Sequence, residues 1–114
     1  MIKLPTSKSE LYELIYSKGR NQVATIIFHE DGGHGWLQVQ KSLVQDLEIE
    51  KKISTYSYID KQFYYLEEDC DLTVFFIAMK LDTNKDLAKE FWEAVPNKYK
   101  DDSFVRHLSR VTIQ

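Results

Sequence analysis

The chain has 114 residues, a formal net charge of −3, a hydrophobic fraction of 43% and a charged fraction of 29%. This length predicts one domain, and the composition excludes a disordered chain. The acidic balance argues against binding to a nucleic-acid backbone, which requires a basic face. No apolar run approaches the roughly 18 residues of a membrane span, and the N-terminal residues lack a signal-peptide apolar region. A single cysteine excludes an internal disulfide, so we expect a cytoplasmic protein with no membrane contact.

A helix is predicted near the N-terminus. Ser7 and Glu10 have the spacing of a capping box, and apolar residues from Leu11 onward then fall on one helical face. Gly19 is suited to the left-handed position that ends such a helix.

The next segment predicts a β-hairpin. Residues 22–29 are β-branched and apolar on both alternating faces, as expected of a central strand covered on each side. The glycine-rich residues 30–35 predict a turn, and residues 36–39 predict the returning strand. Apolar residues at helical spacing then predict a short helix over residues 42–47.

A second hairpin is predicted in the middle of the chain. Residues 53–58 alternate as a strand, residues 59–62 form its turn, and residues 63–66 form the partner strand. The alternation directs Tyr56 and Tyr58 to the same side of the first strand. We therefore expect this ribbon to have one aromatic side.

Two further helices are predicted. Asp69 or Asp71 would cap an apolar helix over residues 72–81, although the β-branched and aromatic residues there keep a strand as the alternative. Thr83 and Asp86 form a second capping-box pair before an amphipathic helix that a proline terminates.

The tail, residues 103–114, fits either a helix or an added strand. The predicted order is α-β-β-α-β-β-α-α plus this tail. We therefore expect a single α+β domain, residues 1–114, with an antiparallel sheet of about four strands and helices packed against it.

The first predicted turn carries the densest polar group of the chain. His29, Asp31 and His34 could ligate zinc or another divalent ion. However, their spacing matches no standard zinc motif. The alternative is a solvated turn in which His34 packs beside Trp36.

An acidic junction surrounds the only cysteine. Glu67, Glu68, Asp69 and Asp71 could in principle bind magnesium, whereas the alternative is helix capping with the other carboxylates solvated. Neighbouring carboxylates oppose thiolate formation at Cys70, which indicates a core or capping cysteine. No phosphate loop, nucleophile elbow, paired CxxC or HExxH is present, so we favour a protein that is not an enzyme and has no cofactor.

Aromatic and acidic residues provide the predicted binding surface, because exposed tyrosines are typical interface anchors. Its expected members are Trp36, Tyr56, Tyr58, Tyr64, Glu67, Glu68 and Asp69. Half-buried tyrosines that cover sheet edges are the alternative. A loose basic group that includes Arg106 and Arg110 is interpreted as solvated surface.

Several segments resemble a family of small uncharacterised bacterial proteins associated with plasmids and phages. The similar segments are residues 33–37 (GHGWL), 53–58 (ISTYSY), 66–71 (LEEDCD) and 102–106 (DSFVR), so the resemblance covers residues 28–106. The family has no known activity. The resemblance implies a mobile-element protein that inhibits or modulates a host protein.

A second similarity runs through residues 36–49 and concerns AbrB-type swapped-hairpin DNA-binding domains. The proline usual before the lysine is Gln40 here, and the glycine usual before the isoleucine is Glu48. The acidic charge also departs from that pattern.

Three hypotheses follow from the sequence. The first is a non-enzymatic module that binds a protein partner, and it is compatible with a homodimer because an uncovered strand edge favours pairing. The second is a metal-dependent hydrolase centred on the His29–His34 turn. The third is a swapped-hairpin DNA-binding dimer.

Overall fold

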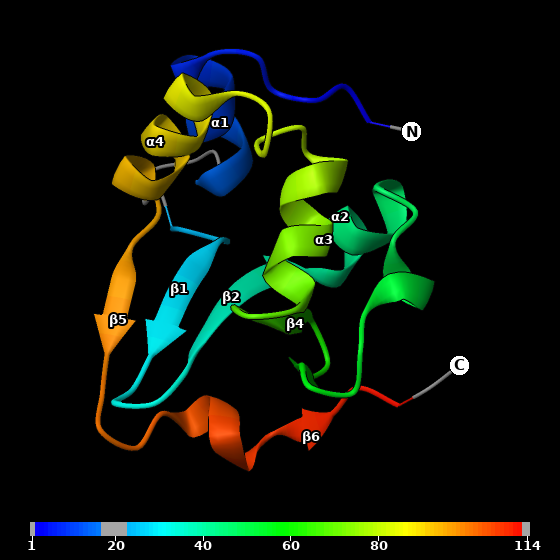
Figure 1. The fold of residues 1–114 in the computed structure, drawn as a ribbon, viewed down its shortest axis with the longest axis vertical. Helices are drawn as coiled ribbons and strands as arrows, with labels where there is room; N and C mark the ends of the chain where they lie inside the picture. Colours follow the sequence, from blue (N-terminus) through cyan, green and yellow to red (C-terminus); the bar gives the residue numbers. More distant parts are fainter. Residues whose placement is uncertain (1, 17–22, 113–114) are drawn as a thin grey trace.

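A six-stranded sheet organises the structure, a computed structural model that describes residues 2–16 and 23–112 (Figure 1). Its strands are β1 (Ile27–Glu30), β2 (Gly35–Gln40), β3 (Tyr58–Ile59), β4 (Phe63–Glu67), β5 (Asn97–Tyr99) and β6 (Ser109–Arg110). They lie in the order β5-β1-β2-β4-β3-β6. β1 and β5 pair in parallel, and the other pairs are antiparallel.

The described residues also form four α-helices and two short 3-10 helices. They are α1 (Lys8–Ile15), α2 (Lys41–Asp46), η1 (Glu50–Lys52), α3 (Asp71–Ala78), α4 (Lys85–Ala94) and η2 (Phe104–His107). The predicted order of helices and strands is therefore confirmed from α1 to α4, including the helix after the acidic junction, whereas β5 was not predicted. None of these helices is long and apolar enough to cross a membrane.

The predicted sheet of about four antiparallel strands was too small and lacked the parallel pair. β5 has three residues and β6 has two, which is too short to produce a recognisable alternation. The tail contains both a short 3-10 helix and a strand, since β6 follows η2 after Leu108.

The helix caps follow the sequence signals only in part. Ser7 caps α1, and its Oγ accepts from Glu10 N at 3.3 Å. The predicted Thr83 cap is wrong, because Asn84 Oδ1 accepts from Leu87 N at 3.1 Å and α4 begins one residue later. The predicted C-terminal stop at Gly19 and the start of the first strand at residue 22 lie outside the described residues.

The acidic cap predicted for α3 is also wrong. Cys70 occupies the cap position, exposed and without a capping hydrogen bond. Asp71 is instead 1% exposed. Its carboxylate accepts from Ser54 N at 3.0 Å, from Ser54 Oγ at 2.8 Å and from Ser57 Oγ.

These bonds to Asp71 explain why the predicted strand over residues 53–58 is reduced to its last residue. A buried carboxylate requires hydrogen-bond donors, and residues 54–57 bend to supply them. The first predicted strand is shortened too, since β1 begins at Ile27.

The sheet has two covered faces. Leu37 and Val39 belong to the large apolar cluster beneath α1, α3 and α4, while Trp36 points to the opposite face. On that face Trp36, Tyr58, Tyr65 and Val105 form a smaller cluster, in which Val105 comes from η2. Figure 1 shows the C-terminal segment (orange to red) at the opposite end of the fold from α1 and α4.

Candidate functional site

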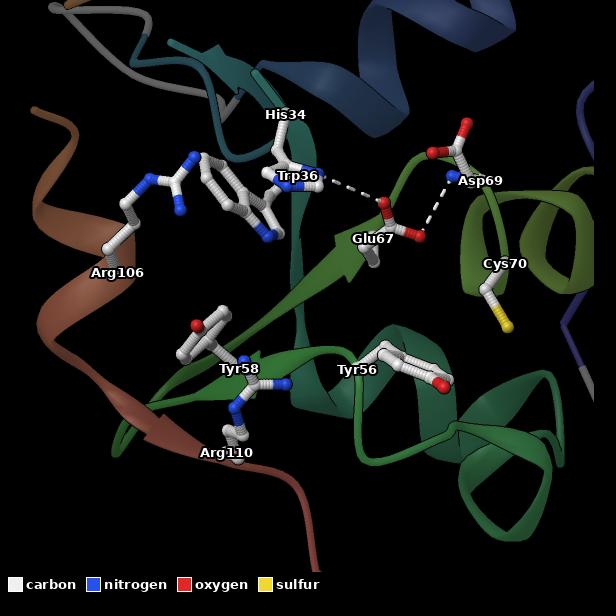
Figure 2. Close-up of a pocket in the computed structure, with 9 residues that line it drawn as sticks. All are labelled: His34, Trp36, Tyr56, Tyr58, Glu67, Asp69, Cys70, Arg106 and Arg110. Atoms are coloured by element: carbon white, nitrogen blue, oxygen red, sulfur yellow. Dashed lines mark hydrogen bonds and ion pairs between the residues drawn. The ribbon is translucent and has the colours of Figure 1, made fainter. Parts of the chain in front are cut away.

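A pocket of about 420 Å³ opens on the sheet face opposite the helices (Figure 2). It is lined by His34, Trp36, Tyr56, Tyr58, Glu67, Asp69, Cys70, Arg106 and Arg110, and we call it the Trp36 pocket. Its volume lies within the range of protein sites that take a small molecule, about 300–1,000 Å³. Figure 2 shows the two arginines on one side and the acidic residues on the other.

Strand alternation places the pocket walls. Trp36 of β2, Tyr58 of β3 and Glu67 of β4 share one face, because side chains on successive strand residues point to opposite faces. The C-terminal segment adds Arg106 and Arg110. Segments distant in the sequence therefore meet at this site.

Aromatic rings stacked with guanidinium groups form one side of the pocket. The Trp36 and Tyr58 rings meet edge to face with centroids 6.1 Å apart. Arg106 Cζ lies 5.3 Å from the Trp36 ring centroid, and Arg110 Cζ lies 5.1 Å from that of Tyr58. Such stacking holds both arginine side chains against the walls. Tyr56, 65% exposed, lies at the rim.

The two arginines differ in their partners. Arg106 donates through Nε and Nη2 to the Asp31 carboxylate, which also accepts from the backbone of Gly33 and His34. The Arg106 guanidinium is the main reason that the pKa of Asp31 lies well below its usual range. Arg110 donates to Thr55 O at 3.2 Å, and no carboxylate among the described residues lies within 4 Å of it. Arg110 is therefore the arginine available to an anionic group.

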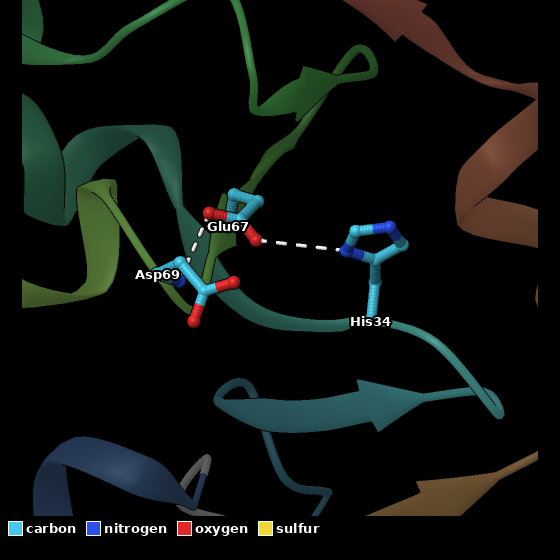
Figure 3. Close-up of side chains that lie close together, drawn as sticks. All are labelled: His34, Glu67 and Asp69. Atoms are coloured by element: carbon cyan, nitrogen blue, oxygen red, sulfur yellow. Dashed lines mark hydrogen bonds and ion pairs between the residues drawn. The ribbon is translucent and has the colours of Figure 1, made fainter.

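The opposite side of the pocket is acidic. Glu67 is 9% exposed, and burial is the main cause that raises its pKa. Its Oε2 accepts from Asp69 N at 2.9 Å, and its Oε1 lies 3.9 Å from His34 Nδ1 (Figure 3). His34 and Asp69 are exposed. The pocket thus combines aromatic walls with opposite charges at its two sides.

Most residues of the predicted binding surface line this pocket. They are Trp36, Tyr56, Tyr58, Glu67 and Asp69. Tyr64 lies on the other sheet face, 5% exposed within the large apolar cluster, because it alternates with its neighbours on β4. Glu68 is half-buried and does not line the pocket.

The predicted metal ligands His29, Asp31 and His34 are not brought together. His29 is 5% exposed, and its Nε2 lies 2.8 Å from Gln38 Oε1. Burial is the main cause that lowers the pKa of His29. The carboxylate of Asp31 is occupied by Arg106. Of the three, only His34 lies beside the acidic side of the pocket.

Arg106 and Arg110 line this site although neither was predicted to belong to it. The contact that positions Arg106 joins residues 75 positions apart, from Asp31 to the C-terminal segment. No local spacing encodes such a contact. Their arginine identity was the only available signal, since arginine is common at binding sites.

None of the protein-family models, curated proteins or solved structures that were compared with this chain matches it.

Proposed function

We propose that the protein is a non-enzymatic protein-binding module whose Trp36 pocket receives a side chain of its partner. One observation carries the proposal: tryptophan, tyrosine and arginine, the residue types most enriched at binding hot spots, converge on one pocket. The buried walls are held in place by packing, while exposed Tyr56 stands at the rim. An anchor side chain can enter such a pocket with little rearrangement of the walls.

The residues that line the pocket indicate which side chains of a partner would fit it. An apolar or aromatic side chain fits between Trp36 and Tyr58, where ring contacts and burial favour it. A carboxylate next to it in the partner would pair with Arg110, whose charge has no carboxylate within 4 Å among the described residues. The resemblance to plasmid- and phage-associated proteins suggests that this partner is a host protein.

Affinity capture tests the proposal. The tagged full-length protein is incubated with bacterial lysate in the presence of a chelator, and the captured proteins are quantified for wild type and variants. Tyr56→Ala and Arg110→Ala should each reduce capture of the same protein roughly tenfold or more, the effect of losing a hot-spot side chain. Both side chains are exposed, so the fold should be retained.

A matched control is Tyr99→Ala. Tyr99 is 60% exposed, close to the 65% of Tyr56, but it lies on β5 and does not line the Trp36 pocket. Capture by this variant should equal that by wild type. Equal capture by the Tyr56 and Tyr99 variants, or no protein captured by wild type, would contradict the proposal.

A further inference from the structure

Three potential metal ligands meet at the acidic side of the Trp36 pocket. One donor atom each from His34, Glu67 and Asp69 lies within 4.8 Å of the others (Figure 3). Two atoms that bind the same zinc ion at about 2.1 Å can be no more than about 4.2 Å apart. His34 Nδ1 and Glu67 Oε1 already meet this limit at 3.9 Å. Asp69 is exposed, and ion binding would require its carboxylate to move within the same limit.

His34 is the only basic side chain among the described residues that lies within 4 Å of the Glu67 carboxylate. Glu67 is 9% exposed, and its Oε1 accepts no hydrogen bond from the described residues. Across the part of the chain that the structure describes, no lysine or arginine lies within 4 Å of Glu67 or Asp69. Arg106 lines the same pocket but is paired with Asp31. Buried carboxylates are normally paired or bound to a metal.

The surrounding hydrogen bonds orient these donors. The backbone N–H of His34 donates to Asp31 Oδ1 at 3.0 Å, which fixes the turn that carries the imidazole. The backbone N–H of Asp69 donates to Glu67 Oε2 at 2.9 Å, which leaves Oε1 directed at His34. Such outer contacts are typical of metal sites, where they orient the ligands.

We propose that His34, Glu67 and Asp69 bind a divalent transition-metal ion, with zinc as the reference ion. One imidazole and two carboxylates suit zinc or manganese better than calcium or magnesium, which prefer oxygen ligands alone. Three protein ligands would leave at least one coordination position for water or a ligand, and all three residues line the Trp36 pocket. The ion would thus add a fixed positive charge to the acidic side of the pocket. This site takes His34 from one ligand set predicted from the sequence and Glu67 and Asp69 from the other, and it requires no protein partner.

Calorimetric titration of zinc chloride into the chelator-treated full-length protein tests the site. We expect one ion per chain. Asp69→Asn and Glu67→Gln should each weaken zinc binding by about tenfold or more, because removal of a ligand costs at least as much as removal of an outer-shell partner. The exposed position of Asp69 makes loss of the fold unexpected in Asp69→Asn, and circular dichroism verifies both variants.

The chain contains a matched control pair. His107 Nε2 lies 3.2 Å from Asp102 Oδ1 on the surface, away from the pocket. The double variant Asp102→Asn/His107→Gln should keep wild-type affinity. In nuclear magnetic resonance spectra, zinc should shift the His34 imidazole signals and leave those of His107 unchanged. Absence of one-to-one binding, or equal weakening in the control variant, would overturn the proposal, and neither result depends on partner capture.

Discussion

The two faces of the central sheet differ in what the same strands bury. Beneath α1, α3 and α4, β2 and β4 contribute Leu37, Val39 and Leu66, each 0% exposed. On the opposite face, the same two strands contribute aromatic rings together with the buried polar side chains of Gln38 and Glu67. One face is thus a continuous apolar core, and the other is a partly polar layer covered by the C-terminal segment.

We expect the two faces to contribute differently to folding stability and to binding. The helix-covered face buries mainly apolar side chains, and such burial is the main source of folding free energy. The opposite face depends on specific contacts, above all the ion pair between Asp31 and Arg106, and it contains the Trp36 pocket. Substitutions on the two faces should therefore change the free energy of unfolding by different amounts and with different pH dependence.

The largest effect is expected on the helix-covered face. Phe75→Ala removes a ring that is 0% exposed on α3 and lies against Phe91 with centroids 6.3 Å apart. The free energy of unfolding should fall by about 3–5 kcal/mol, because burial is lost and a cavity remains. Urea denaturation measures the change. Val105→Ala, also 0% exposed but in the smaller cluster, should lose only about 2 kcal/mol. An equal loss in both variants would contradict the assignment of the main core to the helix-covered face.

Alternation along β2 and β4 made the two faces predictable from the sequence, as did the apolar pattern of the helices. Ser7 was also recognisable as a cap. By contrast, the turn over residues 54–57 depends on Asp71, a carboxylate that accepts hydrogen bonds from Ser54 and Ser57. The pattern of polar and apolar residues does not show which buried carboxylate will accept hydrogen bonds from a loop elsewhere in the chain.

The candidate site was also predictable only in part from the sequence. Tyr56 and Tyr58 carried an aromatic signal, and the acidic junction supplied Glu67 and Asp69. The arginine side of the pocket comes from the C-terminal segment, which reaches the sheet through β6 and the Asp31 ion pair. These contacts are long-range, so they arise from the tertiary fold and not from local spacing.

A smaller, pH-dependent effect is expected from Arg106→Ala. The guanidinium of Arg106 lowers the pKa of Asp31 in the folded state. Its stabilisation is therefore present above the unfolded pKa of about 4 and is lost as the pH falls through the lower folded value. At neutral pH the variant should melt a few degrees below wild type. The two melting temperatures should begin to converge below about pH 4 and become equal only as the pH falls through the folded pKa of Asp31.

Arg110→Ala is the control for this comparison. Arg110 has no carboxylate within 4 Å among the described residues, so its loss should not produce a difference that disappears in acid. Thermal unfolding followed by circular dichroism across the acidic range measures all three proteins. A gap between wild type and Arg106→Ala that stays constant with pH would show that the ion pair does not contribute the difference.

The smallest effect, and one of opposite sign, is expected from Glu67→Gln. Burial raises the pKa of Glu67, so its neutral form is favoured by folding, and that contribution is lost as the pH rises through the folded value. Glutamine keeps an acceptor for Asp69 N and remains neutral. At neutral pH and without metal, the variant should therefore be more stable by about 1 kcal/mol or less, and the gain should vanish below about pH 4.

Glu68→Gln, outside the pocket, is the control for this variant and should change stability little. Zinc should reverse the order by stabilising wild type more than the variant, because an ion that binds the native state more tightly raises its melting temperature further. A metal-free variant less stable than wild type at neutral pH would show instead that ionised Glu67 stabilises the fold through His34.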